Sequence, residues 1–278
     1  MDTRFWGPSG WKFLHLLLEL LPDTLTHNNS IIVKEFMLCW RNILPCKYCR
    51  LSFTKYTSSY PIDKHLDTKK NLTKWMWVIH NKVNNKLRRQ GYCNYDNPDY
   101  NLIRQYNQNI ASNITNPIRL LMELGHDYIG SIIINYSAYI NNNLDIIPVI
   151  NGYYYELMKL LPEILQIIVE TNDKYLIESK PIIKKIHEYY INNQIKLADN
   201  NSNNDSNNDS NNDILIKWYY GIICLVNSNY CVSKIDKFID HFKPYIVDSC
   251  NSKHSTQKLN SCRKKNISQY TRKYIRII

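Results

Sequence analysis

The chain has 278 residues, of which 44% are hydrophobic, so it is long enough for one large or two ordinary domains with packed cores. The polar start and the short, interrupted apolar run at 11–21 lead us to expect neither a secretory signal nor a membrane-spanning helix. The formal net charge is +11, and residues 251–278 carry eight Lys or Arg and no acidic residue. We interpret this basic tail as a solvated segment, with phosphate binding as the alternative.

Hydrophobic spacing predicts an all-α protein in two parts. The first part, residues 1–97, is rich in aromatic residues, and the second, residues 98–278, is a mostly helical domain of unknown role. Residues 202–213 are three copies of Ser-Asn-Asn-Asp, a composition that cannot build a core. We therefore predict a disordered loop at about 199–213, with helices resuming at 214–226 and 235–246.

Pro8 and Ser9 are predicted to open the first helix, because proline is favoured in a first turn. Trp11 and His15 are four residues apart in this helix and therefore lie on one face. A single histidine beside a tryptophan is more often an interior residue with a hydrogen-bond partner than a ligand, so spacing alone does not assign His15 a function.

Two cysteines, Cys46 and Cys49, follow Pro45 and are separated by two residues. The proline predicts a helix start, where the positive helix end together with Lys47 and Arg50 would lower the pKa of both thiols. Such a pair either cycles between dithiol and disulfide or holds zinc with a second pair of ligands. No second close cysteine pair and no closely spaced histidine pair follows, so redox chemistry is favoured.

Residues 71–89 show the clearest helical spacing in the first part. One stripe is apolar and predicted to be buried, and it consists of Leu72, Trp75, Met76, Ile79, Val83 and Leu87. The adjoining stripe is aromatic and hydrogen-bonding, and it consists of Trp77, His80, Asn81, Asn84 and Arg88. This second stripe suits a flat heterocycle with a polar edge, and a polar helix surface is the equally weighted alternative.

A redox cysteine pair needs an acceptor for two electrons, and thiols alone react slowly with dioxygen. A cofactor held between the helix before the pair and the helix after it would supply this step. The chain has no Gly-x-Gly-x-x-Gly motif, so a dinucleotide on a Rossmann sheet is not expected.

Three motifs in this order resemble the Erv/ALR sulfhydryl oxidases. They are Trp6-Gly7-x-x-Gly10-Trp11-x-x-x-His15, then Pro45-Cys46-x-x-Cys49, and then Trp75-x-x-x-x-His80-Asn81-x-Val83-Asn84-x-x-Leu87. The resemblance covers roughly residues 1–100. The Asn-rich composition and the long C-terminal half look most like the version of this enzyme in giant DNA viruses such as mimivirus.

The resemblance implies a bundle of four to five helices that binds FAD, forms a homodimer and oxidises pairs of protein thiols to disulfides, with dioxygen reduced to hydrogen peroxide. It implies that Cys49 lies against the flavin and that Cys46 is the outer, exposed sulfur attacked by substrate. It also implies a set of flavin-binding residues, namely Trp6, Gly7, Trp11, His15, Trp77, His80, Asn81, Val83, Asn84, Lys86 and Leu87. No metal site is expected.

The chain departs from the family pattern at three places. Trp77 occupies a position where the family commonly has a cysteine paired to one downstream, so Cys93, which remains near the downstream position, is expected to lack that disulfide. Pro8 stands where the family often has an arginine. The segment 94–97 replaces a tryptophan-rich stretch that often helps to hold the adenine.

Four cysteines lie in the second part of the chain. Many enzymes of this family relay electrons through a second cysteine pair on a flexible segment, and Cys250 and Cys262, which flank a polar stretch, are the favoured candidates. Cys224 and Cys231 are the alternative. In one unbroken helix their seven-residue separation, about 10 Å, would be too long for a disulfide, although the polar residues 227–229 could break that helix.

The second part shows no recognisable catalytic group of residues. His126 and Asp127 are adjacent and are predicted to point apart on a helix. We expect an interaction or dimer-forming module. The alternatives to a thiol oxidase are a zinc-stabilised helical binding protein and a nucleic-acid-binding protein that uses the basic tail. The expected location is the host cytoplasm, in the viral factory, and the virion, without contact with a membrane.

Overall fold

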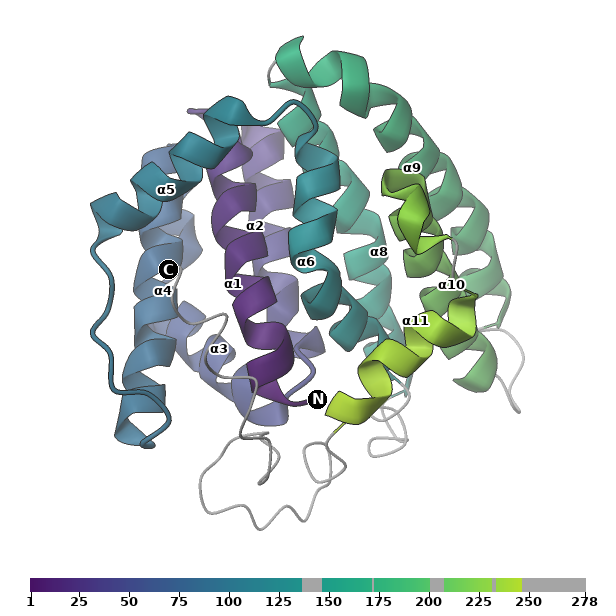
Figure 1. Ribbon diagram of the computed structural model, residues 1–278, viewed down its shortest axis with the longest axis horizontal. Coiled ribbons are helices and arrows are strands. Elements are labelled where there is room, and N and C mark those ends of the chain that lie inside the picture. The colour runs from purple at the N-terminus through teal and green to yellow at the C-terminus, as the bar shows by residue number, and fades with distance from the viewer. Residues whose placement is uncertain (137–146, 172, 201–207, 232–233, 247–278) are drawn as a thin grey trace.

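The computed structural model describes residues 1–136, 147–171, 173–200, 208–231 and 234–246, and the regular elements of these residues are helices, as predicted (Figure 1). Thr24 and Thr68 form an isolated β-bridge. The α-helices are α1 (Thr3–Leu20), α2 (His27–Ile43), α3 (Lys47–Ser59), α4 (Lys69–Arg89), α5 (Tyr100–Asn113), α6 (Pro117–Ile134), α8 (Ile147–Glu170), α9 (Asp173–Asn200), α10 (Asn208–Val226) and α11 (Ile235–Phe242). Three short 3-10 helices are η1 (Ile62–His65), η3 (Ser228–Tyr230) and η4 (Lys243–Tyr245).

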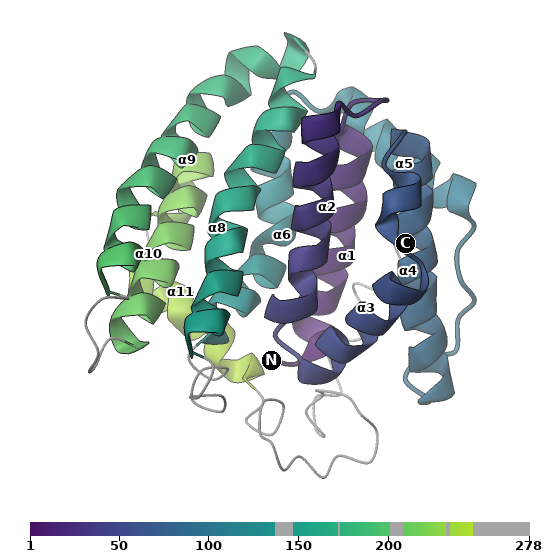
Figure 2. The same ribbon diagram turned by 180° about the vertical axis from the view of Figure 1, so that it is seen from behind.

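Four roughly aligned helices form the middle of the molecule, with α1 against α6 and α2 against α8 (Figures 1 and 2). Helices α3, α4 and α5 lie on one side of this group, and α9 and α10 lie on the other. One apolar core runs through both parts of the chain, from Phe13 and Trp40 to Leu161 and Trp218. The predicted domain division at residue 97 falls between α4 and α5 and stays a prediction.

The first helix begins earlier than predicted, at Thr3 rather than at Pro8. The side chain of Asp2 explains this start, because it accepts a hydrogen bond of 2.9 Å from the Arg4 amide and so caps the helix. Pro8 lies inside the helix, where it has no N–H to donate to the preceding turn, so the helix loses one backbone hydrogen bond. The cap and the buried apolar face outweigh this loss.

The helix predicted at 71–89 is confirmed as α4, which Thr68 caps by accepting a hydrogen bond from the Asn71 amide. Its residues Trp75, Met76 and Ile79 are fully buried, as the apolar stripe predicted. The spacing predictions in the second part are confirmed as α6 and α8, whose buried faces include Ile118, Leu121, Met122, Leu157, Leu160, Leu161, Ile164 and Ile168.

The predicted loop at 199–213 was too long. Helix α9 extends to Asn200 and α10 begins at Asn208, so only residues 201–207 of the predicted loop lie outside the described residues. The apolar segment at 214–226 anchors α10, because Leu215, Trp218 and Ile222 are buried in the core. The helix predicted at 235–246 ends at Phe242 and continues as η4.

The last described residues return to the start of the chain. The Asp2 amide donates a hydrogen bond of 2.7 Å to the Tyr245 carbonyl, and the rings of Phe5 and Tyr245 stack with centroids 3.7 Å apart. Residues at the two ends of the described chain therefore lie together beneath α1. None of the helices that the structure describes combines the length and the apolar character needed to cross a membrane.

Candidate redox site

The two cysteines lie where α3 begins, as predicted. Cys46 is the N-cap residue of α3, and its Sγ accepts a hydrogen bond of 3.3 Å from the Cys49 amide. The Cys46 carbonyl also accepts from the amides of Cys49 and Arg50, at 2.9 and 3.0 Å. The helix start therefore fixes the two sulfurs one turn apart, and both are thiols in this structure.

The two thiols differ in acidity. Burial opposes ionisation of Cys46, but hydrogen bonds from the Cys49 side chain and amide, together with the Arg50 charge, outweigh it and lower the pKa of Cys46 to about 7. The same hydrogen bond to Cys46, and burial, raise the pKa of Cys49 well above its usual value. The prediction that both pKa values fall was wrong for Cys49, because the first thiolate to form disfavours a second one beside it.

The two sulfurs also differ in their surroundings. Cys46 is completely buried, in the same apolar cluster as Met1, whereas Cys49 is partly exposed and lines a cavity. The expectation of an exposed Cys46 was therefore wrong for this dithiol state, because residues at the start of the chain pack within that cluster.

The cavity that Cys49 lines is bounded by helices α1, α2, α3, α4 and α6. Its wall is mainly aromatic and aliphatic, and Lys86 supplies its one cationic side chain among the described residues. The lining residues are Thr3, Trp6, Gly7, Gly10, Trp11, Leu14, Trp40, Leu44, Cys49, Ser52, Phe53, Val83, Lys86, Leu87, Gln90 and Tyr128. Six of the eleven predicted flavin-binding residues are among them, namely Trp6, Gly7, Trp11, Val83, Lys86 and Leu87.

The other predicted flavin-binding residues do not line this cavity. His15 and His80 form a buried pair, with 3.0 Å between His15 Nε2 and His80 Nδ1, and the His80 ring stacks on Trp11. Burial lowers the pKa of His15 to about 4 and that of His80 well below its usual value, so both rings are neutral at pH 7. The imidazole pair therefore positions Trp11, which does face the cavity.

Trp77, Asn81 and Asn84 also lie away from the cavity wall. The Trp77 indole N–H donates a hydrogen bond of 2.9 Å to the Pro98 carbonyl and its ring packs edge-on against Tyr100, so this side chain faces the segment before α5. Asn81 and Asn84 are buried in α4. The residues of the hydrogen-bonding stripe on α4 therefore face different neighbours, and the α4 residues that line the cavity are Val83, Lys86 and Leu87.

Sequence reasoning missed part of the cavity wall. Trp40 on α2 and Tyr128 on α6 contribute rings that pack against each other, with centroids 5.1 Å apart, and Tyr128 also stacks on Trp6 at 5.8 Å. Gly10 permits this arrangement, because a Cβ atom there would come within 2.8 Å of Tyr128 Cδ2. The hydrophobic spacing of the second part predicts helices but not which helix each of them would meet.

Three polar atoms in the cavity wall are buried and have no hydrogen-bond partner among the described residues. They are Thr3 Oγ1 and the indole nitrogens of Trp6 and Trp40. Unpaired buried donors are costly in a folded protein and are expected where a ligand supplies the acceptors. The wall therefore suits a flat, largely apolar ring with hydrogen-bonding groups at its edge.

Comparison with known proteins finds a family similar to the segment that carries this site. The sequence model of the Erv1 / Alr family matches residues 8–106. No solved structure shows a significant match to the chain.

Three relatives show how much of the chain the likeness covers. A "Probable FAD-linked sulfhydryl oxidase" of Acanthamoeba polyphaga mimivirus is 34% identical over 85 residues, or 30% of this chain and 59% of the relative. The mitochondrial FAD-linked sulfhydryl oxidase of Saccharomyces cerevisiae is 32% identical over 34% of this chain and 49% of its own length. An FAD-linked sulfhydryl oxidase of African swine fever virus is 28% identical over 31% of this chain and 70% of its own length. The chain thus spans less than two thirds of the first two relatives.

The cavity beside Cys49 offers a cradle that fits an isoalloxazine ring. The aromatic walls, the unpaired indole donors and the Lys86 ammonium, whose Nζ donates to Ser52 Oγ at 2.8 Å, match a flat heterocycle with carbonyl and ring-nitrogen acceptors. A zinc site at the cysteine pair is not supported, because no third ligand lies close to Cys46 and Cys49 among the described residues.

The remaining cysteines differ in state. Cys224 and Cys231 form a disulfide with 5.1 Å between their Cα atoms. The helix break considered from the sequence makes this possible, because α10 ends at Val226 and η3 turns the chain back. Cys39 is a buried thiol, and the Cys93 thiol lies 3.8 Å from the Asn84 carbonyl. Cys250, Cys262 and the basic tail lie outside the described residues.

Proposed function

We propose that this chain is an FAD-dependent sulfhydryl oxidase that converts pairs of protein thiols to disulfides and passes the electrons through Cys46 and Cys49 to FAD and dioxygen, giving hydrogen peroxide. One observation carries the proposal: Cys49 opens into the same aromatic cavity as Trp6, Trp11 and Lys86. The Erv1/Alr match and the FAD-linked names of the relatives support it.

In this proposal the oxidised Cys46–Cys49 pair accepts two electrons from substrate. A substrate thiolate attacks Cys46 Sγ, which breaks the bond between the two cysteines and leaves Cys49 as the departing thiol. A second substrate thiolate then attacks the substrate sulfur of the mixed disulfide and displaces Cys46. A thiol with a pKa of about 7 is a good leaving group, which suits Cys46 to this step.

Return of the pair to a disulfide releases two electrons and two protons. FAD, when bound, supplies a two-electron acceptor that dioxygen can reoxidise. Trp6, Trp11, Trp40 and Tyr128 would hold the ring and exclude water around it. Cys49 is the sulfur at the cavity, and Lys86 favours negative charge there, because its ammonium works against the raised pKa of Cys49.

Access of substrate to Cys46 requires movement, because this sulfur is buried in the dithiol state. A second cysteine pair could accept electrons from a bulky substrate and relay them to the buried Cys46. We propose Cys250 and Cys262 for that role. Cys224 and Cys231, already joined in a disulfide, are the alternative. A homodimer, and a location in the host cytoplasm and the virion, complete the proposal.

The test is peroxide formation by the purified, FAD-loaded chain supplied with a reduced, unfolded protein. We expect one peroxide per disulfide formed. Cys49→Ser should abolish turnover while the protein stays yellow, and Cys93→Ser, a matched control outside the cavity, should keep its rate. A colourless protein that cannot be reconstituted with FAD, or turnover that survives in Cys49→Ser, would refute the proposal.

A further inference from the structure

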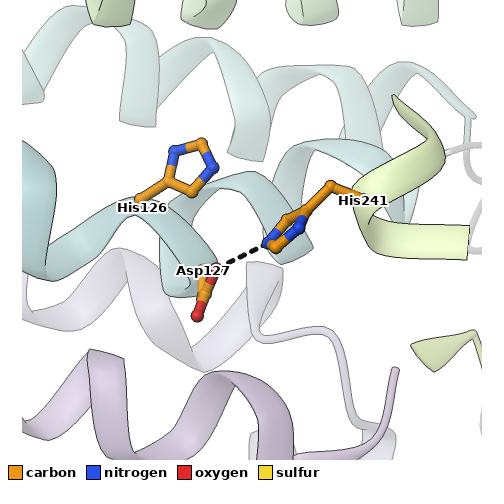
Figure 3. Close-up of side chains that lie close together, drawn as sticks. All are labelled: His126, Asp127 and His241. Atoms are coloured by element: carbon orange, nitrogen blue, oxygen red, sulfur yellow. Dashed lines mark hydrogen bonds and ion pairs between the residues drawn. The ribbon is translucent and has the colours of Figure 1, made fainter. Parts of the chain in front are cut away.

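A cluster of potential metal ligands lies between α6 and α11, and none of its members lines the redox cavity (Figure 3). His126 and Asp127 come from α6, and His241 comes from α11. One ligand atom from each residue lies within 4.8 Å of the other two, and His241 Nε2 is 3.0 Å from Asp127 Oδ1. Side chains from two segments that are more than a hundred residues apart therefore converge on one point.

His126 and Asp127 are adjacent on α6 and were predicted to point apart. Their ligand atoms nevertheless lie within 4.8 Å of each other. Consecutive helix residues are rotated by about 100°, so two neighbours can reach the groove beside a helix from adjoining faces. The His126 ring lies among Tyr219, Phe238 and Phe242, with centroid distances of 5.6 to 6.4 Å, and these rings direct it toward α11.

Two imidazoles and one carboxylate are a common ligand set for zinc and similar ions. Bonds of about 2.0–2.1 Å in tetrahedral geometry place ligand atoms about 3.3 Å apart. The ligand atoms of the three residues lie up to 4.8 Å apart, so the longest separation has to shorten by about 1.5 Å. His241 and Asp127 are partly exposed, with side chains 47% and 37% accessible, and can rotate to close it.

The surroundings leave room for an ion with one open position. A cavity of about 400 Å³ adjoins the three ligands and is also lined by Glu123 and Lys237. Glu123 Oε1 already accepts hydrogen bonds from Arg119 and Asn227, so we do not count Glu123 as a ligand. The three protein ligands then leave the fourth tetrahedral position for water. The Lys237 ammonium opposes a bound cation and should weaken its binding.

We propose that His126, Asp127 and His241 bind a divalent first-row transition metal ion, such as zinc. The ion would clamp α11 onto α6. Because α11 continues directly into η4, whose Tyr245 pairs with Asp2 and Phe5, the clamp would also hold the C-terminal segment against the start of α1. The competing interpretation is an ion pair between a protonated His241 and Asp127 that has no affinity for metal.

The test is a calorimetric titration of zinc into the full, FAD-loaded chain and its variants. All variants keep the same eight cysteines, so any zinc bound by thiols is common to them. We expect His241→Ala to lose one site per chain or to weaken it at least tenfold, because even outer-shell changes at metal sites cost roughly 10–100-fold. Lys237→Gln should strengthen the same site, and His27→Ala, an exposed histidine on α2, should leave it unchanged.

Folding of the variants is checked by their melting temperatures without metal. His241 is exposed, so its replacement should leave the fold intact, and zinc should raise the melting temperature of the wild type but not of His241→Ala. Equal zinc stoichiometry and affinity in the wild type and His241→Ala would overturn the proposal. Zinc binding that His27→Ala lowers as much as His241→Ala does would overturn it as well.

Discussion

The indole ring of Trp11 lies flat on the imidazole of His80, with centroids 3.9 Å apart and 9° between the planes. The contact joins α1 to α4, the two helices on either side of the cysteine pair in the sequence. His15, also on α1, adds a second contact between the two helices through its hydrogen bond to His80. The His80 ring therefore supports Trp11, which lines the cavity.

The buried imidazoles make stability depend on pH. The pKa of His15 is about 4 because burial disfavours its charged form, whereas the usual value is 6.5. The unfolded chain therefore binds an extra proton between these values, and the free energy of unfolding should fall as pH drops from about 6.5 toward 4, by at most about 3 kcal/mol from this residue.

Urea unfolding at pH 7.5, 6 and 5 measures this effect. The fall should be smaller in His15→Gln than in the wild type, while His27→Gln, a change at an exposed histidine, should keep the wild-type dependence. A pH dependence that is the same in all three proteins would show that His15 does not hold a neutral buried ring.

Gly10 should be needed for the cavity wall. An alanine there would place its Cβ 2.8 Å from Tyr128 Cδ2, so the ring must move, and such overpacking typically costs about 1–3 kcal/mol. We expect Gly10→Ala to melt at a lower temperature and to retain less FAD on gel filtration.

Gly152 supplies the matched control for this change, because it lies in α8 with nothing within 4 Å of an added Cβ. Gly152→Ala should stabilise the protein slightly, since alanine is favoured over glycine in a helix by about 0.5–1 kcal/mol. If the two variants behave alike, the close approach of α1 to Tyr128 is not important for FAD retention.

Lys86 should tune the acidity of Cys49. Hydrogen bonding to Cys46 and burial raise the pKa of Cys49, and the Lys86 charge works against them. Lys86→Met should therefore raise this pKa further and move the acidic limb of the pH–rate profile to higher pH. Lys82→Met, also on α4 but outside the cavity wall, should leave the profile in place.

The two distal cysteine pairs can be separated by the size of the substrate. If Cys250 and Cys262 relay electrons, replacing both with serine should spare oxidation of a small dithiol and slow oxidation of a reduced protein. The Cys224→Ser, Cys231→Ser double variant should keep both rates and lose stability, by about 2 kcal/mol for a loop of this length. Equal rates of the Cys250, Cys262 double variant on both substrates would reject the relay.

Local patterns in the sequence were sufficient to predict the helices that carry the site. The spacing of Leu72, Trp75 and Met76 predicted α4, and the proline before Cys46 predicted the start of α3. The cap at Asp2 was missed because Pro8 gave the stronger local signal, although a side-chain cap also sets a helix start.

Contacts between distant helices could not be predicted from periodicity. Tyr128 reaches the cavity from a helix more than a hundred residues after Trp6, and His241 meets His126 across a similar separation. A stripe of residues defines the face of a helix but not its neighbour, so the contacts of Trp77 with Pro98 and of His80 with Trp11 could not be predicted. The burial of Cys46 likewise depends on tertiary packing.

The most direct test of the central claim is an anaerobic titration of the FAD-loaded chain with a dithiol, followed by its visible absorption. One equivalent should bleach the yellow colour, and admitting air should restore it with release of one equivalent of hydrogen peroxide. Cys49→Ser should stay yellow throughout. Bleaching that is equally fast in Cys49→Ser, or no bleaching in the wild type, would contradict electron transfer from the cysteine pair into this cavity.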